Sequence, residues 1–492
     1  MKKNSLTTAL VAGIAGVAGF AGLANAVDLN PDGLGEVLIY PYYTVNKSQD
    51  TLLSVVNTAD VSKAVKVRIL EGRNSREVLD FNLFLSPWDV WTAAITQVGD
   101  DPLGGKILTR DNSCTWPVGA LKGAGEKFRT SMFDGSVGPK DGAGTGADRT
   151  REGYIEIISM ADIVPGSPLD KTVIHGASGS PACNGAILAS PAAADLDVPT
   201  GGLFGSGMVA NVPDGTLFAY NADAIDGFSD IVQFTGGQSL DPSLATANSA
   251  ISTVSGAVAF VFDRGSLINL DYPNGIDAVS AVFTADAIYN EYQVDPALGS
   301  NTDWVVNFPT KRFYVDPLMG GLGDPPFVEP FAGGSNVQIG LFMYDQEEDS
   351  PTEEACGGFS PPNPGEIDCG TYLPWEVNVI SFLDPADPDA GVVSGVLGSD
   401  KLVSNLRPFA PYGWLKMDLV SDTSGSPLDG GVGHALDPDA NNQVMHGLPV
   451  TGFYAFNVIN ANAAPGMLAN YNGVFRHRAS RFCTGEDGAA CS

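Results

Sequence analysis

The sequence predicts an all-β fold of antiparallel β-sandwich domains with long Gly/Pro-rich loops and minimal helix. Apolar runs are short and end at Gly, Pro, Asn or Asp, and the 59 Gly and 33 Pro supply many turns. This composition favours many short strands over long helices. In one run, Val65, Val67 and Ile69 alternate with Lys66 and Arg68. Such alternation is typical of a strand with one buried face.

The stretch from residue 35 to residue 95 is expected to form most of the first sheet. It contains the runs GEVLIYPYYTVN, TLLSVVNT, KAVKVRILEG and SREVLDFNLFLSPWDVWTAAI. Asn57, Gly72 and a Ser-Pro pair separate these runs, as turn chemistry requires. We expect Trp88 and Trp91, which flank the start of the last run's strand, to lie in the sandwich core.

The chain also repeats part of itself, which predicts two related sandwiches. Similar segments occur in the same order, and their separation shortens along the chain, as shorter loops in a second copy would produce. The matched pairs are PWDV (87–90) with PWEV (374–377), GYIEI (153–157) with GWLKM (413–417), and GMVAN (207–211) with GFYAFN (452–457). Coincidence among Gly- and Pro-rich strands is the alternative. In a second copy, residues 304–315 would take the place of 37–45.

The predicted order along the chain is a signal peptide (1–26), a first sandwich (27–235), a helical or loop linker (236–255) and a second sandwich (256–492). The linker holds the best helix candidate. Asp241 is a suitable N-cap, Pro242 suits the first helical position, and SLATANSAIST follows.

Residues 1–26 are expected to be an export signal. Lys2 and Lys3 precede a short apolar core, and Ala24-Asn25-Ala26 supplies a small-x-small cleavage pattern. A membrane anchor is the alternative, which the short Gly-rich core disfavours. We expect no transmembrane helix later in the chain, because no other stretch approaches the roughly 20 apolar residues that span a bilayer. The mature protein is therefore expected at the cell surface, outside the cell or in the periplasm.

The charge balance is strongly acidic. The chain has 26 Lys+Arg against 57 Asp+Glu, a net charge of −31. A nucleic-acid partner is not expected, because phosphates would be repelled. Either bound cations or a well-solvated surface would accommodate so much like charge. The basic clusters at 311–312 and 476–481 are expected to pair with carboxylates within or between molecules.

Six cysteines in an exported chain predict three disulfides, with 15 formal connectivities. Local pairing is the simplest arrangement for two of them, which leaves the most distant pair for the third. The predicted bonds are Cys356–Cys369, Cys483–Cys491 and Cys114–Cys183. Metal binding by these cysteines is disfavoured because the sequence contains no CxxC spacing.

Two segments carry a family resemblance. TDWVVNFPTKRFYVDP (302–317) and EVLIYPYY (36–43) resemble exported proteins of Gram-negative bacteria that are described only as cell surface proteins. The resemblance implies a location outside the cytoplasm. It brings no catalytic residues and no mechanism.

A calcium site is the one metal site that the sequence suggests. Asp28, Asn30 and Asp32 offer oxygen ligands at alternate positions and a glycine follows, as in the first half of a Ca²⁺ loop. The twelfth position, which should be a bidentate acid, is Ile39, although Glu36 could partly compensate. An acidic turn before the first strand is the alternative. The acidic segments 384–389 and 437–442 are expected to be solvated turns.

No catalytic residues and no other cofactor are expected. His175 and Ser178 lie in HGASGSP, which faintly resembles the nucleophile loop of serine proteases, but no second base accompanies them. The four histidines stand at 175, 434, 446 and 477, without metal-ligand spacing.

These observations favour a secreted or cell-surface structural or adhesive protein without catalytic activity. Its partners are expected to be further copies, other surface proteins or polysaccharide. Residues 27–45 could lend a strand to a neighbour's sheet edge. A secreted carbohydrate-binding module or carbohydrate-active enzyme is one alternative. An outer-membrane β-barrel is another, disfavoured because the strands are irregularly spaced and the chain ends in Cys491-Ser492 without a terminal aromatic.

Overall fold

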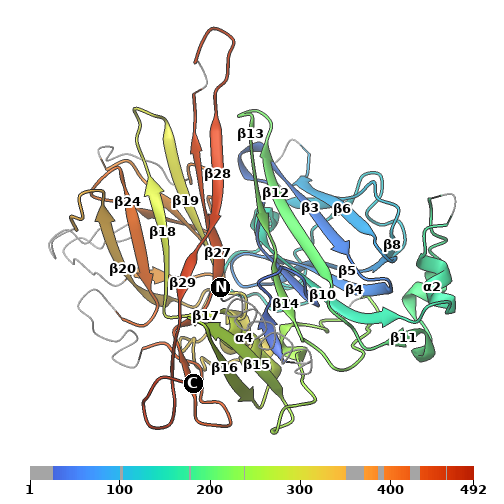
Figure 1. The fold of residues 1–492 in the computed structure, drawn as a ribbon. Coiled ribbons are helices and arrows are strands. Elements are labelled where there is room, and N and C mark those ends of the chain that lie inside the picture. The colour runs from blue at the N-terminus through green and yellow to red at the C-terminus, as the bar shows by residue number, and fades with distance from the viewer. Residues whose placement is uncertain are drawn as a thin grey trace, which may run out of the picture.

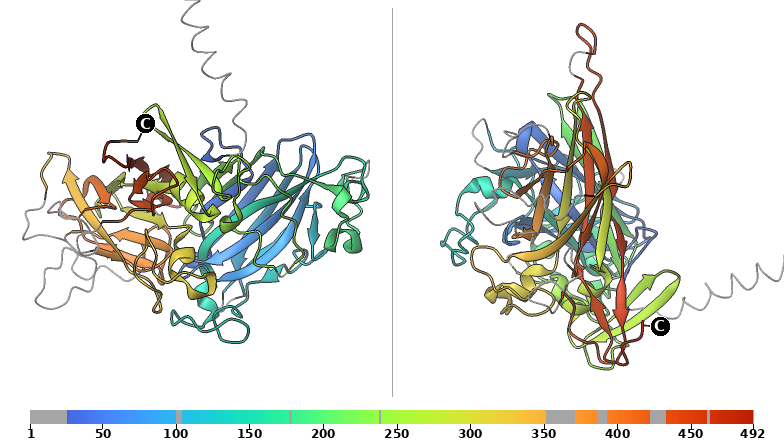
Figure 2. Two further views of the ribbon diagram at one scale, coloured as in Figure 1. Left: turned by 90° about the horizontal axis from the view of Figure 1, so that it is seen from below. Right: turned by 90° about the vertical axis from the view of Figure 1, so that its left-hand side faces the viewer.

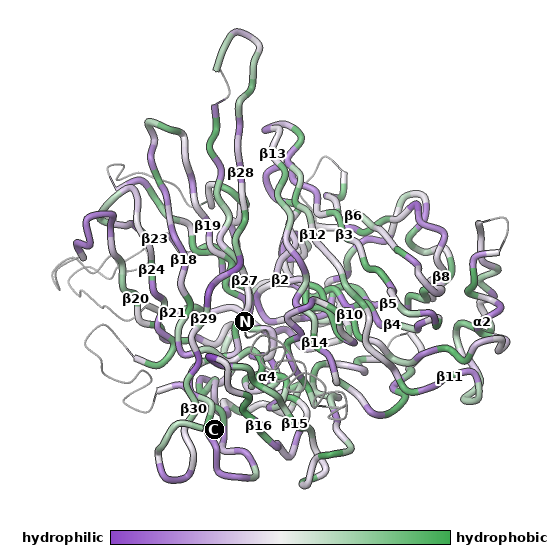
Figure 3. The backbone as a smooth tube through the Cα atoms, viewed as in Figure 1, coloured by the Kyte–Doolittle hydropathy of each residue, from purple (hydrophilic) through white to green (hydrophobic). Residues whose placement is uncertain are grey.

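The computed structural model describes residues 26–99, 104–176, 179–237, 239–350, 371–385, 393–421, 433–460 and 463–491. It confirms the all-β class: the elements are mostly strands, joined into antiparallel sheets (Figure 1). Two β-sandwiches lie side by side, and the molecule is elongated across them (Figure 2). Figure 3 shows hydrophobic stretches along the strands and hydrophilic ones in many of the connecting turns.

The first sandwich is built from a ten-stranded and a six-stranded sheet. The larger has the order β16-β15-β1-β14-β2-β10-β4-β5-β8, with β11 beside β10. Its strands are β1 (Val27–Leu29), β2 (Val37–Thr44), β4 (Ser62–Glu71), β5 (Glu77–Leu85), β8 (Cys114–Trp116), β10 (Glu152–Ile163), β11 (Leu196–Asp197), β14 (Asp223–Asp226), β15 (Ala257–Asp263) and β16 (Ser266–Tyr272). The smaller has the order β13-β12-β3-β6-β7-β9. Its strands are β3 (Gln49–Asn57), β6 (Val90–Gln97), β7 (Gly105–Leu108), β9 (Glu126–Lys127), β12 (Leu203–Asn211) and β13 (Thr216–Asn221).

The second sandwich consists of two five-stranded sheets. One has the order β21-β20-β24-β18-β29 and the other β23-β22-β19-β27-β28. The strands are β18 (Ala287–Gln293), β19 (Ser300–Asn307), β20 (Val337–Asp345), β21 (Thr371–Leu373), β22 (Val377–Phe382), β23 (Val403–Leu406), β24 (Tyr412–Asp418), β27 (Thr451–Val458), β28 (Tyr471–Arg476) and β29 (Arg478–Ser480). Two small sheets pair β17 (Thr284–Ala285) with β26 (Leu448–Pro449) and β25 (Val444–His446) with β30 (Phe482–Thr484).

The predicted helix at Asp241 is wrong. Only a short 3-10 turn, η4 (Leu244–Thr246), forms there. Tertiary hydrogen bonds take the backbone groups that a helix would use, since the Gln233 amide donates to the carbonyl of Thr246 at 2.7 Å. The described α-helices are α2 (Pro168–Val173), α3 (Gly185–Ala189), α4 (Gly275–Phe283) and α5 (Lys311–Val315).

The two sandwiches share one strand order. The order of strands within each sheet is the same when ten strands of the first sandwich are matched, in chain order, with ten of the second. The ten of the first are β2, β3, β4, β5, β6, β7, β10, β12, β13 and β14. Their counterparts are β18, β19, β20, β21, β22, β23, β24, β27, β28 and β29. One pairing differs, because β6 and β7 are antiparallel whereas β22 and β23 are parallel. This order supports the predicted duplication. It places β18, rather than residues 304–315, at the position of β2.

A glycine at matched positions adds to this support. Gly153 of β10 lies against the backbone of β4, where an added Cβ would stand 2.0 Å from the carbonyl oxygen of Leu70. Gly413 of β24 lies in the same way against β20, where its Cβ would stand 2.1 Å from the oxygen of Tyr344. Both glycines therefore allow the same close approach of matched strands.

The hydrophobic core crosses the predicted domain boundary. One buried cluster joins Val37 and Ile39 of β2 to Leu415 and Met417 of β24. Strands β15 and β16, expected in the second domain, extend the first sheet through β1. The two halves are thus one interleaved body.

Residues 27–45 are built into this body, and within the range only Pro31 and Asp32 are exposed. All of β2 is buried between β14 and β10, so lending this segment to a neighbour would dismantle the core. Trp91 is buried as expected, but the expectation for Trp88 is wrong because its side chain is 69% exposed.

Candidate functional site at the junction of the two sandwiches

The turn between β4 and β5 is organised around one buried carboxylate. The backbone N–H groups of Arg73, Asn74 and Arg76 donate to Glu71 at 2.8, 2.9 and 3.0 Å. The turn therefore closes on an anion, and its shape depends on that charge.

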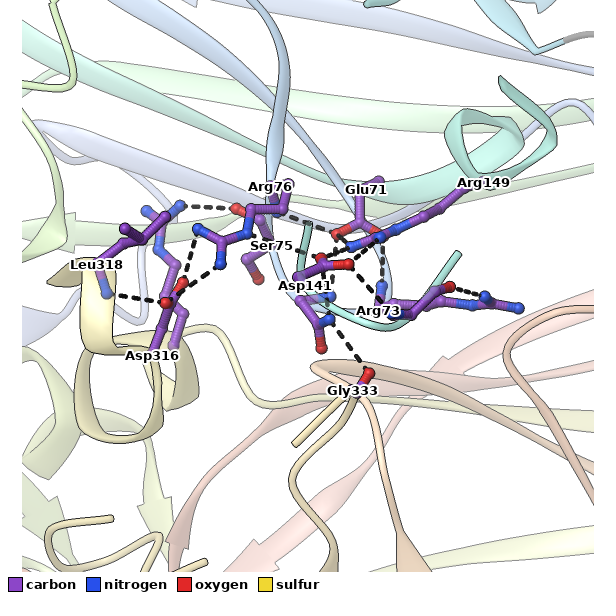
Figure 4. A network of polar contacts seen from close by, with 12 residues as sticks. Glu71, Arg73, Ser75, Arg76, Asp141, Arg149, Asp316, Leu318 and Gly333 are labelled. Carbon is purple, nitrogen blue, oxygen red and sulfur yellow. Dashed lines mark hydrogen bonds and ion pairs between the residues drawn. The ribbon is translucent and has the colours of Figure 1, made fainter. Parts of the chain in front are cut away.

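Arg149, in the turn before β10, pairs with the charge of Glu71. Its Nε and Nη2 donate to the two oxygens of Glu71 at 2.7 and 2.8 Å. Its Nη1 donates to Asp141 at 2.7 Å (Figure 4). Burial favours the protonated form of Asp141, but the hydrogen bonds and charge of Arg149 outweigh it and hold the pKa of this carboxyl below its ordinary value.

Two arginines carry the network from the first sandwich to the second. Arg76 Nη1 lies 2.9 Å from Asp316, which follows α5 (Figure 4). Arg312 of α5 donates from Nη2 to Glu156 of β10 at 3.1 Å and from Nη1 to the carbonyl of Ser75 at 3.2 Å. The contact of Arg312 with Glu156 confirms the expected carboxylate pairing for Arg312, whereas Lys311 donates to backbone carbonyls instead.

The same turn also docks on the second sandwich through its backbone. The N–H groups of Glu376 and Val377 donate to the carbonyls of Arg73 and Gly72 at 3.1 and 2.8 Å. The Arg73 guanidinium lies over the ring of Trp375, 5.1 Å from its centroid. An arginine in this position adds a cation–π attraction to the hydrogen bonds.

Lys311 ties the segment after β19 to the start of β22. Its ammonium is buried and donates to the carbonyls of Ser335, Pro374 and Trp375 at 2.5, 3.2 and 3.2 Å. Burial lowers the pKa of Lys311 to about 8, although nearby Glu376 opposes this change. Burial likewise raises the pKa of Glu376 to about 8, with Lys311 opposing.

The junction therefore joins the two sandwiches through buried ion pairs and hydrogen bonds. Residues 302–317, which carry the family resemblance, supply Lys311, Arg312 and Asp316 to it. The sequence did not indicate Glu71, Asp141 or Arg149, because their partners are remote in the chain. One signal for this site was present in the sequence: Glu71 is a charged residue at the end of the apolar strand β4.

The four predicted calcium ligands do not converge. Asn30 accepts a hydrogen bond from the N–H of Asp32 at 2.9 Å, and Asp32 points to solvent. Asp28 lies in β1 opposite Asp226 of β14. Glu36 is buried and accepts from the N–H of Ser229 at 2.9 Å. The described residues contain no group of three or more acidic, His or Cys side chains arranged for a metal. Calcium binding stays a prediction.

We expect stability to decrease as the pH rises, because of Asp28, Glu36 and Asp226. Burial, aided by the Asp226 charge, raises the pKa of Asp28 to about 7, and burial raises that of Glu36 to about 8. Burial also raises the pKa of Asp226. At these three carboxyl groups the folded protein binds more protons than the unfolded chain between about pH 4 and pH 8, so their contribution to stability falls across that range.

Thermal melts from about pH 5 to pH 8 check this expectation. Asp28→Asn combined with Glu36→Gln should flatten the dependence, while Asp32→Asn, on the exposed turn, should leave it unchanged. A stability that rises across this window would contradict the assignment.

Two disulfides lie in the described residues, Cys114–Cys183 and Cys483–Cys491. Both are pairs that the sequence predicts. Cys114–Cys183 joins β8 to the loop before α3 and closes 69 residues of sequence separation, which should stabilise the fold by about 4 kcal/mol on the chain-entropy model. The predicted pair Cys356–Cys369 lies outside the described residues.

A serine, a histidine and an aspartate meet at the β5–β6 turn. His175 Nδ1 lies 2.9 Å from Ser86 Oγ and 3.6 Å from Asp89, and Ser86 Oγ donates to Asp89 at 3.1 Å. In a catalytic triad the serine and the acid contact opposite ring nitrogens. Here both contact Nδ1, and the Ser86 proton is directed at the carboxylate. The group caps a turn, and Ser178 lies outside the described residues.

Comparison of the chain with protein-family models, with curated proteins and with solved structures gives no significant match. Within the described part of the chain, no helix is long and apolar enough to cross a membrane.

Proposed function

We propose that this chain is an exported, non-catalytic structural or adhesive protein of the cell surface. The observation that supports the proposal best is the junction, where Glu71, Arg149, Arg76 and Asp316 couple the two sandwiches by buried charges. Because a buried charge without a partner is costly, these ion pairs favour the one arrangement of the two sandwiches in which the charges meet. Such stiffness suits a protein that presents its outer surfaces in fixed positions.

The predicted export signal and the two disulfides support a location outside the cytoplasm, where thiols are oxidised. Fractionation of the native cells followed by immunogold electron microscopy tests the proposal. The label is expected on the outer surface or in shed material. Label confined to the cytoplasm, or a purified protein that turns over a hydrolase substrate panel, would contradict it.

A second candidate function is binding of polysaccharide, favoured by an aromatic face on the second sandwich. Tyr344 of β20 and Trp414 of β24 stack with their ring centroids 4.5 Å apart, and Trp414 is 40% exposed. Beside them, Lys416 lies 5.0 Å from the ring of Phe342. Flat aromatic rings flanked by polar groups are surfaces on which sugar rings pack.

If this face binds polysaccharide, Trp414→Ala should weaken binding about tenfold, since a stacked aromatic contact contributes about 0.5–1.5 kcal/mol beyond area burial. Affinity gel electrophoresis with immobilised glycans measures the change. Tyr471→Ala, an exposed aromatic on β28, is the matched control. A blank glycan array for the unmodified protein would remove this candidate.

A further inference from the structure

The two sandwiches carry equivalent corners just before matched strands. PWDV (87–90) leads into β6, and PWEV (374–377) leads into β22. Strands β6 and β22 hold the same place in their sheets. Trp88 thus corresponds to Trp375, and Val90 to Val377.

The second corner is occupied by a β-hairpin turn of the same chain. Two carbonyls of the β4–β5 turn accept hydrogen bonds from the N–H groups of Glu376 and Val377, and Arg73 covers the ring of Trp375. Val377 is completely buried as a result. A basic residue on a tight turn is therefore the kind of group that this corner accepts.

The first corner keeps the proline, tryptophan and valine, has Asp89 in place of Glu376, and is uncovered. Trp88 is 69% exposed and Val90 is 49% exposed. Trp88 also holds a φ of 61°, a left-handed conformation that is unfavourable for an aromatic residue. The surrounding turn maintains it: the Trp88 N–H donates to Ala59 at 3.2 Å, and Asp89 accepts from the N–H of Ser86 at 3.0 Å. The fold thus sustains a strained, exposed tryptophan.

We propose that the Trp88–Val90 corner docks a basic β-hairpin turn from a second copy of this chain. The proposal rests on the proposed structural function and names the partner. The internal contact of Arg73 with Trp375 provides the pattern for the side chains alone, because the Asp89 N–H already donates to the carbonyl of Ser86 at 3.2 Å and the left-handed φ of Trp88 is not shared by Trp375. Local charge agrees with it, since Asp89 lies within the corner and Asp111 beside it, and the hydroxyl of Ser113 stands 3.4 and 2.7 Å from their carboxylates.

The β15–β16 hairpin offers an exposed basic turn, in which Arg264 would exchange its present contacts with Asp263 and the carbonyl of Arg481, both at 3.1 Å. Its tip is Arg264-Gly265, and the Arg264 side chain is 78% exposed. Phe262, close to the tip, is 52% exposed and can cover Val90 as Arg264 covers Trp88. By contrast, the end of β20 continues into Glu347, Glu348 and Asp349, which the acidic corner would repel.

The corner and the hairpin lie on different faces of the molecule. Figure 1 shows the β15–β16 hairpin at the lower end, away from β6. Contact between two different surfaces is heterologous, so it builds rings or filaments rather than closing as a two-fold dimer. The proposal therefore predicts association beyond a dimer.

Sedimentation velocity of the exported chain over a range of concentrations tests the proposal, with Trp88→Gly as the key variant. Glycine tolerates the left-handed backbone, so this variant should keep or raise the melting temperature while weakening association at least about tenfold. Arg264→Glu should weaken association comparably. Tyr471→Ser removes an exposed aromatic elsewhere, on β28, and should leave association unchanged.

Three results would overturn the proposal. One is a monomer at every concentration for the unmodified chain. Another is unchanged association in Trp88→Gly. Loss of association in Trp88→Gly but not in Arg264→Glu would reject the β15–β16 hairpin as the occupant. Each of these results can be told apart from a failure of the proposed function, because immunogold labelling measures the surface location independently.

Discussion

Replacing Glu71 by alanine is expected to lower the free energy of unfolding by about 3–5 kcal/mol. The carboxylate accepts three backbone N–H groups of the β4–β5 turn and two N–H groups of Arg149. Its removal leaves the Arg149 charge buried with Asp141 as its remaining carboxylate, and leaves the turn's donors without an acceptor. The turn that docks on Trp375 should loosen at the same time.

Urea unfolding followed by circular dichroism measures this effect. Glu126→Gln is the matched control, because Glu126 pairs with Arg129 at an exposed site and its loss should cost less than about 1 kcal/mol. A loss below about 1 kcal/mol for Glu71→Ala would show that the junction does not contribute as argued. Tryptophan emission cannot replace circular dichroism here, because the chain has 6 Trp and the emission would not report on Trp375 alone.

Gly153→Ala is expected to destabilise the protein by about 3 kcal/mol or more. The new Cβ would stand 2.0 Å from the Leu70 carbonyl oxygen and 2.9 Å from Cα of Glu71, and these are backbone atoms that cannot rotate away. Strands β10 and β4 would have to separate in the middle of the larger sheet. This movement would also displace Glu71 from Arg149.

Two further variants serve as comparisons for Gly153→Ala in the same urea experiment. Gly413→Ala should be comparably destabilising, because its Cβ would stand 2.1 Å from the Tyr344 carbonyl oxygen at the matched position. Gly176→Ala should be nearly neutral, since no atom lies within 4 Å of its Cβ. A tolerated Gly153→Ala would contradict the close packing of these strands.

Sequence periodicity predicted the strands well where one face is apolar. The alternation of Val65, Val67 and Ile69 marks β4 correctly, and the run 36–43 marks β2. The expectation that only one face of β4 is buried is wrong, because Lys66 and Arg68 on the other face are buried too and pair with carboxylates. The repeat PWDV and PWEV pointed to matched positions that the strand order supports. The helix predicted at Asp241 does not extend beyond a 3-10 turn, because the side chain of Gln233 hydrogen-bonds with both the carbonyl and the hydroxyl of Thr246.

The candidate site was predicted in part. The expected pairing of Arg312 with a carboxylate is confirmed by Glu156, but the partners themselves were not identifiable. Glu71 and Arg149 are 78 residues apart in the chain, and no local spacing encodes their contact. Trp88 and Trp375 occur in equivalent motifs, yet one is exposed and the other covered, because a turn of the other sandwich reaches only Trp375.

By itself, the sequence determined the strand class, the turn positions and the two described disulfides, since these depend on side-chain alternation, on backbone preferences and on cysteine count. Tertiary structure alone decided which charges meet inside the junction and which of two equivalent corners is left open. The physical reason is that burial and pairing of a charge depend on chain segments brought together only when the sheets pack.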